Sequence, residues 1–147
     1  MLYADATALS AGDGSLLNPW LALSSIDWDD VLADPDKAVT FSGDFVDERI
    51  LVTASGTVDA PIRIIGNGTT AGTIDGTGGT YGEGIHSALN DYIRVEGGSY
   101  FNIDDGADGS GIDLGTGIGL DVSGATAYDC RLEGIRCSSN KNGIIGS

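Results

Sequence analysis

Short apolar runs alternate with turns rich in glycine, aspartate and asparagine along most of the chain. Between residues 55 and 76, two β-branched runs around Ile62 and Ile74 are separated by a turn of Gly, Asn and Thr residues. Apolar runs of this length, bounded by turn residues, predict short β-strands. From residue 37 onward we expect the strands Ala38–Ser42, Glu48–Thr53, Ile62–Gly66, Gly72–Asp75, Gly84–Ala88, Tyr92–Glu96, Tyr100–Ile103, Gly111–Leu114, Gly119–Val122, Tyr128–Leu132, Gly134–Ser138 and Gly143–Ile145.

Apolar and polar positions also alternate within these runs. Ile93 and Val95 are apolar, whereas Arg94 and Glu96 between and after them are charged. One face of the strand is therefore expected to be buried, with Arg94 pointing outward. Because a strand this short cannot bury its apolar face alone, we expect further strands to stack above and below it.

Glycine directly precedes isoleucine at several predicted strands, among them Gly84-Ile85, Gly111-Ile112 and Gly134-Ile135. Each step brings a small corner residue in front of an aliphatic residue that faces inward. The recurrence favours an all-β solenoid, a parallel β-helix with about 20 to 27 residues per turn. A β-sandwich is the alternative, because it also consists of short strands and tight turns.

The first 36 residues differ from the rest because they carry helical signals. An extended segment and a turn-rich loop come first, and Asn18-Pro19 follows them. Asn18 can cap a helix in which Pro19 takes the first position, and Trp20 and Leu23 then fall on successive turns. We therefore expect a first helix to begin at Asn18.

A second helix is expected over Asp27–Ala33. The hydroxyl of Ser25 can cap it, and Asp34-Pro35 ends it. Its apolar face consists of Trp28, Val31 and Leu32. A short α-helical cap at this position would close the open end of the strand stack. The chain thus divides into an N-terminal extended segment with the capping helix, residues 1–36, and the β-helix turns, residues 37–147.

Composition narrows the range of partners. The chain has 147 residues, 24 of them glycine, and a net charge of −15 from 22 acidic and 7 basic residues. A negative field of this size repels phosphate, so we expect neither a nucleic-acid partner nor an anionic membrane surface. We also expect no membrane insertion and no export signal, because the chain has neither a long apolar window nor a basic start followed by an apolar run.

The two cysteines, Cys130 and Cys137, are seven residues apart, and His86 is the sole histidine. This combination lacks the ligand spacing of a zinc site. Two readings stay open for the pair. The cysteines either occupy core positions on neighbouring faces or form a disulfide.

Four short motifs follow one another in the first half of the chain. They are Gly12-Asp13-Gly14, Asn18-Pro19-Trp20 with Leu23, Gly43-Asp44-Phe45 leading to Glu48, and Ser55-Gly56-Thr57 with Ala60-Pro61-Ile62-Arg63-Ile64. In this order they resemble the N-terminal opening of the right-handed parallel β-helix proteins of the pectate-lyase-like superfamily. The resemblance covers Tyr3–Gly76, about half of the chain. It implies a right-handed parallel β-helix.

Proteins with such openings include polysaccharide lyases, epimerases of acidic polysaccharides, bacterial surface proteins and phage tailspikes, so the fold alone leaves the chemistry open. The chain ends in a Gly-Ile strand with no second cap, and we expect it to continue or to stack on another chain. Our leading hypothesis is a virion or extracellular β-helix, the start of a phage tailspike or receptor-binding protein. Its expected partners are a host-surface polysaccharide or glycan, further copies in a homotrimer, and other virion proteins.

Two alternatives belong to other classes of protein. The first is the N-terminal part of a secreted polysaccharide lyase or epimerase that acts on an acidic polysaccharide, and the second is a purely structural assembly module. Polysaccharide elimination needs a cation and a base at the uronate. The basic residues are Lys37, Arg49, Arg63, Arg94, Arg131, Arg136 and Lys141, with His86. They form no recognisable catalytic constellation, so an enzyme of this kind, lyase or glycosidase, would carry its site in later turns.

The densest acidic loop, IDDGADGSGIDLG, is the one candidate metal site. It contains Asp104, Asp105, Asp108 and Asp113, and carboxylate oxygens are the ligands that calcium prefers. The loop matches neither the EF-hand nor the nonapeptide calcium repeat in full, because glycine stands at positions 106 and 115. We therefore expect a plain acidic turn and no cofactor, with calcium binding as the alternative.

Aromatic residues suggest a candidate glycan surface. Tyr100 and Phe101 are consecutive, so one of them must point outward if both lie in a strand. An outward aromatic ring beside the acidic loop could stack on a sugar. Trp20 and Trp28 lie in the expected cap, where we expect them to pack in the core.

Overall fold

The structure is a computed structural model, and it describes residues 1–66, 72–75, 83–87, 90–96, 101–104, 110–113, 121–123, 126–127 and 136–138. These residues are mostly β-strand, with one short α-helix and one 3₁₀ helix. The elements are β1 (Leu2–Asp5), η1 (Leu23–Ser25), α1 (Trp28–Ala33), β2 (Ala38–Val46), β3 (Ile50–Leu51), β4 (Ile62–Gly66), β5 (Gly72–Asp75), β6 (Glu83–His86), β7 (Ile93–Glu96), β8 (Phe101–Asp104), β9 (Ser110–Asp113), β10 (Asp121–Ser123), β11 (Thr126–Ala127) and β12 (Arg136–Ser138). The all-β prediction is confirmed.

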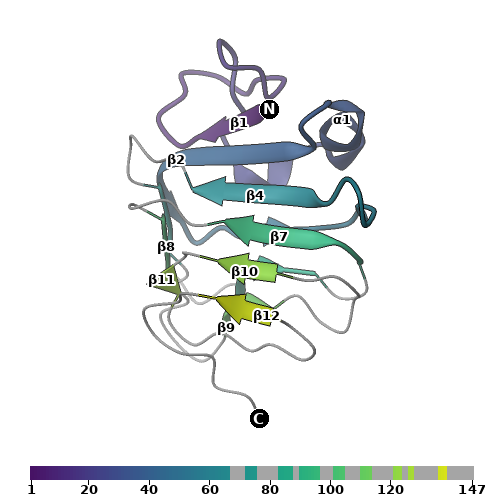
Figure 1. Cartoon of the computed structure of the whole chain (residues 1–147). Coiled ribbons are helices and arrows are strands. Elements are labelled where there is room, and N and C mark those ends of the chain that lie inside the picture. Colours follow the sequence, from purple (N-terminus) through teal and green to yellow (C-terminus); the bar gives the residue numbers. More distant parts are fainter. Residues whose placement is uncertain are drawn as a thin grey trace.

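The named strands pair only in parallel within the described part of the chain. One sheet has the order β11-β8-β5-β2-β4-β7-β10-β12, with β1 also paired to β2, and a second sheet has the order β3-β6-β9. Figure 1 shows β1, β2, β4, β7, β10 and β12 lying one below another. These hydrogen-bonded pairs are therefore not β-hairpins, because the two strands of a hairpin run antiparallel.

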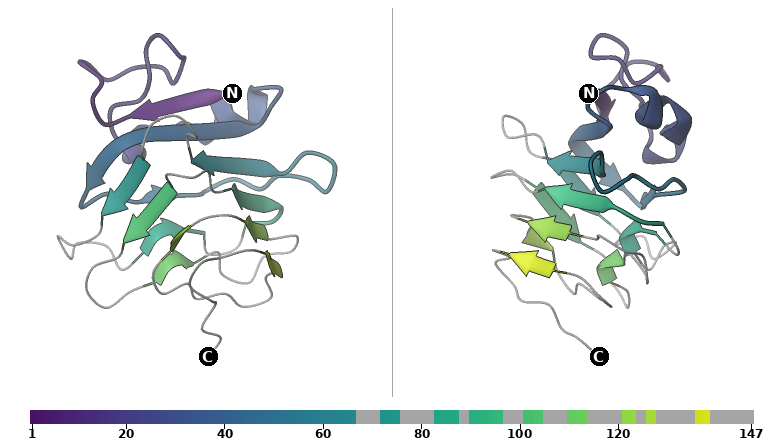
Figure 2. Two further views of the ribbon diagram at one scale, coloured as in Figure 1. Left: turned by 60° about the vertical axis from the view of Figure 1, so that its left-hand side comes forward. Right: turned by 45° about the vertical axis from the view of Figure 1, so that its right-hand side comes forward.

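The long strand β2 belongs to two stacks of strands. Its first half pairs with β4, where Ala38 lies opposite Arg63, and its second half pairs with β5, where Gly43 lies opposite Gly72. Gly43 has φ of +83°, a conformation that residues with a side chain rarely adopt. The left view of Figure 2 shows the strand curving from one stack into the other.

The spacing between paired strands agrees with the prediction at some pairs and exceeds it at others. It is 25 residues between β2 and β4, 27 between β6 and β9, and 24 between β8 and β11. Twenty-nine residues separate Gly43 from Gly72, and the same number separates Gly72 from Phe101. Ile62 pairs with Ile93, at a separation of thirty-one residues. The predicted 20 to 27 residues per turn therefore hold for the first group of pairs and are too few for the second, where the connections between strands take more of the chain than the turn signals indicated.

Apolar side chains occupy matching positions on successive strands. Ile64 lies opposite Val95, Phe45 opposite Ile74, and Ile50 opposite Ile85. All six are at most 1% exposed and belong to one core cluster. Arg94, between buried Ile93 and Val95, is exposed, so the predicted alternation is confirmed.

The helix expected from Asn18 is wrong. The backbone at Trp20 instead forms a parallel bridge with Ala4 in β1. Trp20 N donates to Tyr3 O at 3.0 Å, and Asp5 N donates to Trp20 O at 2.8 Å. The edge of β1 thus offers this segment main-chain partners that a helix would have to give up.

The second expected helix is confirmed as α1, but its cap is a different residue. The carboxylate of Asp27 accepts a hydrogen bond from Asp29 N at 2.9 Å, whereas Ser25 ends the short helix η1. A carboxylate reaches the free N–H groups of a first turn and also suits the positive end of the helix dipole. Trp28 and Val31 are buried, and α1 lies beside the start of β2 (Figure 1).

The strand predictions fared unevenly. The bounds of β4 and β5 coincide with the prediction, and β3 is shorter than the predicted Glu48–Thr53. Gly143–Ile145 and Cys130 lie outside the described residues. Cys137 lies in β12, in register with Val122 and through it with Val95, so the two readings of the cysteine pair stay open.

We predict that Ile64→Ala lowers the free energy of unfolding by about 2–5 kcal/mol, because it removes buried methyl groups and leaves a cavity in the core. Val58→Ala is the matched control, because Val58 is 70% exposed, and a change within about 0.5 kcal/mol is expected there. Chemical denaturation followed by circular dichroism measures both. Equal effects of the two substitutions would contradict the assignment of Ile64 to the core.

Candidate functional site

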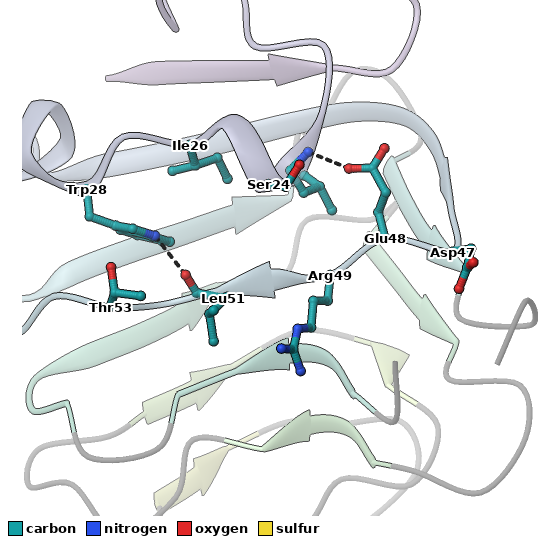
Figure 3. Close-up of a pocket in the computed structure, with 9 residues that line it drawn as sticks. Ser24, Ile26, Trp28, Asp47, Glu48, Arg49, Leu51 and Thr53 are labelled. Atoms are coloured by element: carbon teal, nitrogen blue, oxygen red, sulfur yellow. Dashed lines mark hydrogen bonds between the residues drawn. The ribbon is translucent and has the colours of Figure 1, made fainter. Parts of the chain in front are cut away.

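A pocket of about 320 Å³ lies between the N-terminal segment and strand β3. It is called the cap pocket below, and it is lined by Leu23, Ser24, Ile26, Trp28, Asp47, Glu48, Arg49, Leu51 and Thr53. Figure 3 shows η1 and the following residues along one side and the β2–β3 connection with β3 along the other. The pocket therefore joins two segments that are about 25 residues apart in the chain.

The turn between β2 and β3 places three charged residues on one side of the pocket. Asp47 has φ of +54°, a left-handed conformation that aspartate tolerates better than most residues. The reversal at Asp47 lets Glu48 and Arg49 follow directly along the pocket before β3 begins at Ile50. Both Asp47 and Arg49 also interact with other groups of the protein.

Two hydrogen bonds fasten the N-terminal segment to the β3 side of the pocket. Glu48 Oε2 accepts a hydrogen bond from Leu23 N at 2.6 Å, and Trp28 Nε1 donates to Leu51 O at 2.7 Å (Figure 3). Each hydrogen bond pairs an N–H group that is partly withdrawn from water. Together they fix the width of the pocket at two points.

A second hollow of about 320 Å³ adjoins the cap pocket. It shares Ile26, Trp28 and Thr53 with the cap pocket and adds Ser25, Asp27 and Asp29. The two hollows therefore form one groove with a common apolar wall. Among the described residues that line it, carboxylates outnumber cations, since Arg49 is the single cationic residue.

Only part of the predicted calcium site can be placed. Asp104 is the last residue of β8 and lies in register with Asp75, and Asp113 is the last residue of β9 and lies in register with His86. Asp105 and Asp108 lie outside the described residues. Within the described part of the chain, no three His, Cys, Asp or Glu residues come together as metal ligands. The calcium site stays a prediction.

The predicted glycan surface is also placed only in part. Phe101 begins β8 and lies in register with Gly72. Tyr100 lies outside the described residues. The glycan role of this pair therefore stays a prediction.

A second cluster of charges lies on the outward face of β4 and β7. Arg63 and Glu96 form a bidentate ion pair, with Nε–Oε1 of 2.9 Å and Nη2–Oε2 of 2.6 Å. This pairing raises the pKa of Arg63. Arg63 lies in register with Arg94, which is followed in register by Asp121 and Arg136.

Sequence reasoning did not find the cap pocket. Glu48 belonged to a recognised motif and Arg49 to the list of cations, but neither position indicated a shared cavity. Contact between Glu48 and Leu23 depends on folding the N-terminal segment over β3, which no local pattern encodes. The acidic residue after Gly-Asp-Phe was the one available signal.

Comparisons of the chain with known protein families, with curated proteins and with solved structures found no match. No helix among the described residues is long and apolar enough to cross a lipid bilayer.

We predict that Glu48→Ala lowers the free energy of unfolding by about 1–2 kcal/mol, because Leu23 N loses its charged acceptor. Amide exchange at Leu23 should become faster in the same variant. Asp44→Ala is the control, because Asp44 is an exposed acid on the neighbouring β2. Unchanged exchange at Leu23 would show that Glu48 does not hold the N-terminal segment.

We predict a much smaller effect from the ion pair between β4 and β7. Arg63 and Glu96 are 36% and 26% exposed, so solvent screens their attraction, and Glu96→Gln should cost about 0.2–1 kcal/mol. The loss should shrink further in high salt, since salt screens exposed charges. Denaturation at low and high ionic strength checks both statements. A loss that does not change with salt would contradict an electrostatic origin.

Proposed function

We propose that the chain winds as a right-handed parallel β-helix and forms the start of a phage tailspike or a related receptor-binding surface protein that recognises host-surface glycans. The observation that carries the proposal is the parallel pairing of strands about one turn apart, as in Gly43, Gly72 and Phe101. Successive turns of a solenoid pair in this way because each turn contacts only its neighbours. The motif resemblance of residues 3–76 supports the same fold.

The core supports the winding independently of the motifs. Aliphatic or aromatic residues lie opposite one another in three stacks of strands, which contain the pairs β4–β7, β2–β5 and β3–β6. The facing residues are Ile64 with Val95, Phe45 with Ile74, and Ile50 with Ile85. A single interior shared by three stacks is what a β-helix requires. Extended surfaces of this kind suit long ligands, because they present the same face over many turns.

The charge of the chain supports an extracellular or virion setting and a glycan partner. A net charge of −15 keeps a protein soluble and disfavours binding to nucleic acid. We propose that the full protein assembles as a homotrimer, in contact with other virion proteins. We propose glycans of the host surface as the partner class, because the negative charge disfavours nucleic acid.

A polysaccharide lyase or epimerase and a purely structural assembly module are the alternatives. The register of Arg63, Arg94 and Arg136 is the observation nearest to a lyase groove. Arg63, however, already holds Glu96 through two hydrogen bonds. We therefore rank the lyase below the receptor-binding protein.

The full-length protein provides the test. We predict a trimer by light scattering, together with binding to purified host lipopolysaccharide or capsular polysaccharide in a surface-binding assay. A monomer that binds none of these polymers would contradict the proposal. A rise in near-ultraviolet absorbance on alginate, pectate or glycosaminoglycans would instead support the lyase, because elimination leaves an unsaturated uronate.

A further inference from the structure

We propose that the cap pocket binds a single neutral pyranose ring. The inference depends on the proposed function only for the general class of ligand, a sugar. The pocket itself, with its residues from η1, α1 and the β2–β3 connection, is a feature of the described structure.

The size and shape of the site suit a small ligand. The cap pocket measures about 320 Å³, and the adjoining hollow has the same volume. Small-molecule sites are concave and measure about 300–1,000 Å³. One sugar ring in the cap pocket, with a substituent reaching into the second hollow, fits this arrangement.

The walls offer both of the surfaces that a pyranose presents. Ile26 and Trp28 on one side and Leu51 on the other give the pocket apolar surface for the C–H groups of the ring. Leu51 is 41% exposed, so covering it would remove apolar area from water. The hydroxyls of the ring need donors and acceptors, and polar residues of the same lining supply them.

Ser24 from η1, with Asp47 and Arg49 from the β2–β3 connection, supplies polar groups to the lining. A hydroxyl can donate or accept, a carboxylate accepts at two oxygens, and a guanidinium donates through several N–H groups. Asp47 and Arg49 already interact within the protein, so a sugar hydroxyl would share them with their present partners. Figure 3 shows Ser24 and Arg49 on opposite sides of the pocket.

Charge decides which sugars fit. Asp47, Glu48 and Arg49 line the cap pocket, and Asp27 and Asp29 line the adjoining hollow. With four carboxylates and one cation among its described lining residues, the groove disfavours a further anion. Uronates, sialic acids and sugar phosphates are therefore poor ligands for this site, and a neutral hexose is the best.

Glu48 has a separate part in the site. Its carboxylate holds Leu23 N at 2.6 Å and so keeps η1 in place beside the pocket. It acts as a positioning residue. For that reason the test below leaves Glu48 unchanged and alters Ser24 and Asp47, which also line the pocket.

The test uses the 147-residue chain and saturation-transfer NMR with the methyl glycosides of glucose, galactose and mannose, and with methyl glucuronide as the anionic comparison. At least one neutral glycoside should show transfer, and the glucuronide should show several-fold less. Asp47→Asn keeps a residue that tolerates the left-handed backbone, and Ser24→Ala removes one hydroxyl. Each substitution should lower the affinity for the neutral glycoside, and Asp47→Asn should lower it by about tenfold.

Asp59→Asn is the matched control, because Asp59 is exposed in the turn before β4 and does not line the pocket. It should bind like the unaltered chain, and thermal unfolding of every variant verifies that it is folded. Transfer to no neutral glycoside, equal binding of the glucuronide, or equal binding by Asp47→Asn and Asp59→Asn would each overturn the site. If the full-length protein binds polysaccharide but no glycoside shows transfer, the cap pocket is not a sugar site and the proposed function stands. If a neutral glycoside shows transfer but the full-length protein is a monomer that binds no polysaccharide, the cap pocket stands and the proposed function fails.

Discussion

The parallel register of the strands is the constraint on which the rest of the structure depends. In each stack an apolar residue lies opposite another apolar residue, as Ile64 lies opposite Val95 and Ile50 opposite Ile85. The same pairing satisfies the backbone N–H and C=O groups of both strands. A shift of one residue would move an entire apolar set to the other face. The register therefore determines both which side chains form the core and which side chains, such as Arg94, point outward.

This constraint leaves the first strand with an unpaired edge, and the N-terminal segment covers it. The backbone at Trp20 pairs with β1, and a Cβ added at Gly12 would collide with the carbonyl of Asn18, so the loop packs too closely there for any other residue. Further along, Glu48 and Trp28 fasten the segment to the β3 side. The contacts that close the core thus also build the walls of the cap pocket. The segment that covers the edge of β1 thus also contributes to a concave surface with both apolar and polar residues.

Local patterns predicted the features that depend on local chemistry. The β-branched runs predicted β4 and β5 with their bounds, alternation predicted the exposure of Arg94, and the apolar face before Asp34-Pro35 predicted α1. The helix expected at Asn18 failed because the edge of β1 competes for the same backbone groups, and that edge is distant in the sequence. The cap pocket was missed for the same reason, since it arises only where two separate segments meet. The recurrence of Gly-Ile steps, by contrast, favoured stacked strands, and Ile85 and Ile112 from two such steps lie in register in β6 and β9.

The direction and register of strand pairing can be measured in solution by nuclear Overhauser contacts between backbone protons. Our account predicts contacts that link Ile62 to Ile93 and Ile64 to Val95 in the same order along both strands, with matching contacts between Ile50 and Ile85. Short contacts between α-protons of facing residues, running in opposite order along the two strands, would indicate antiparallel sheets. That result would contradict the stacked parallel architecture, and with it the winding that we propose.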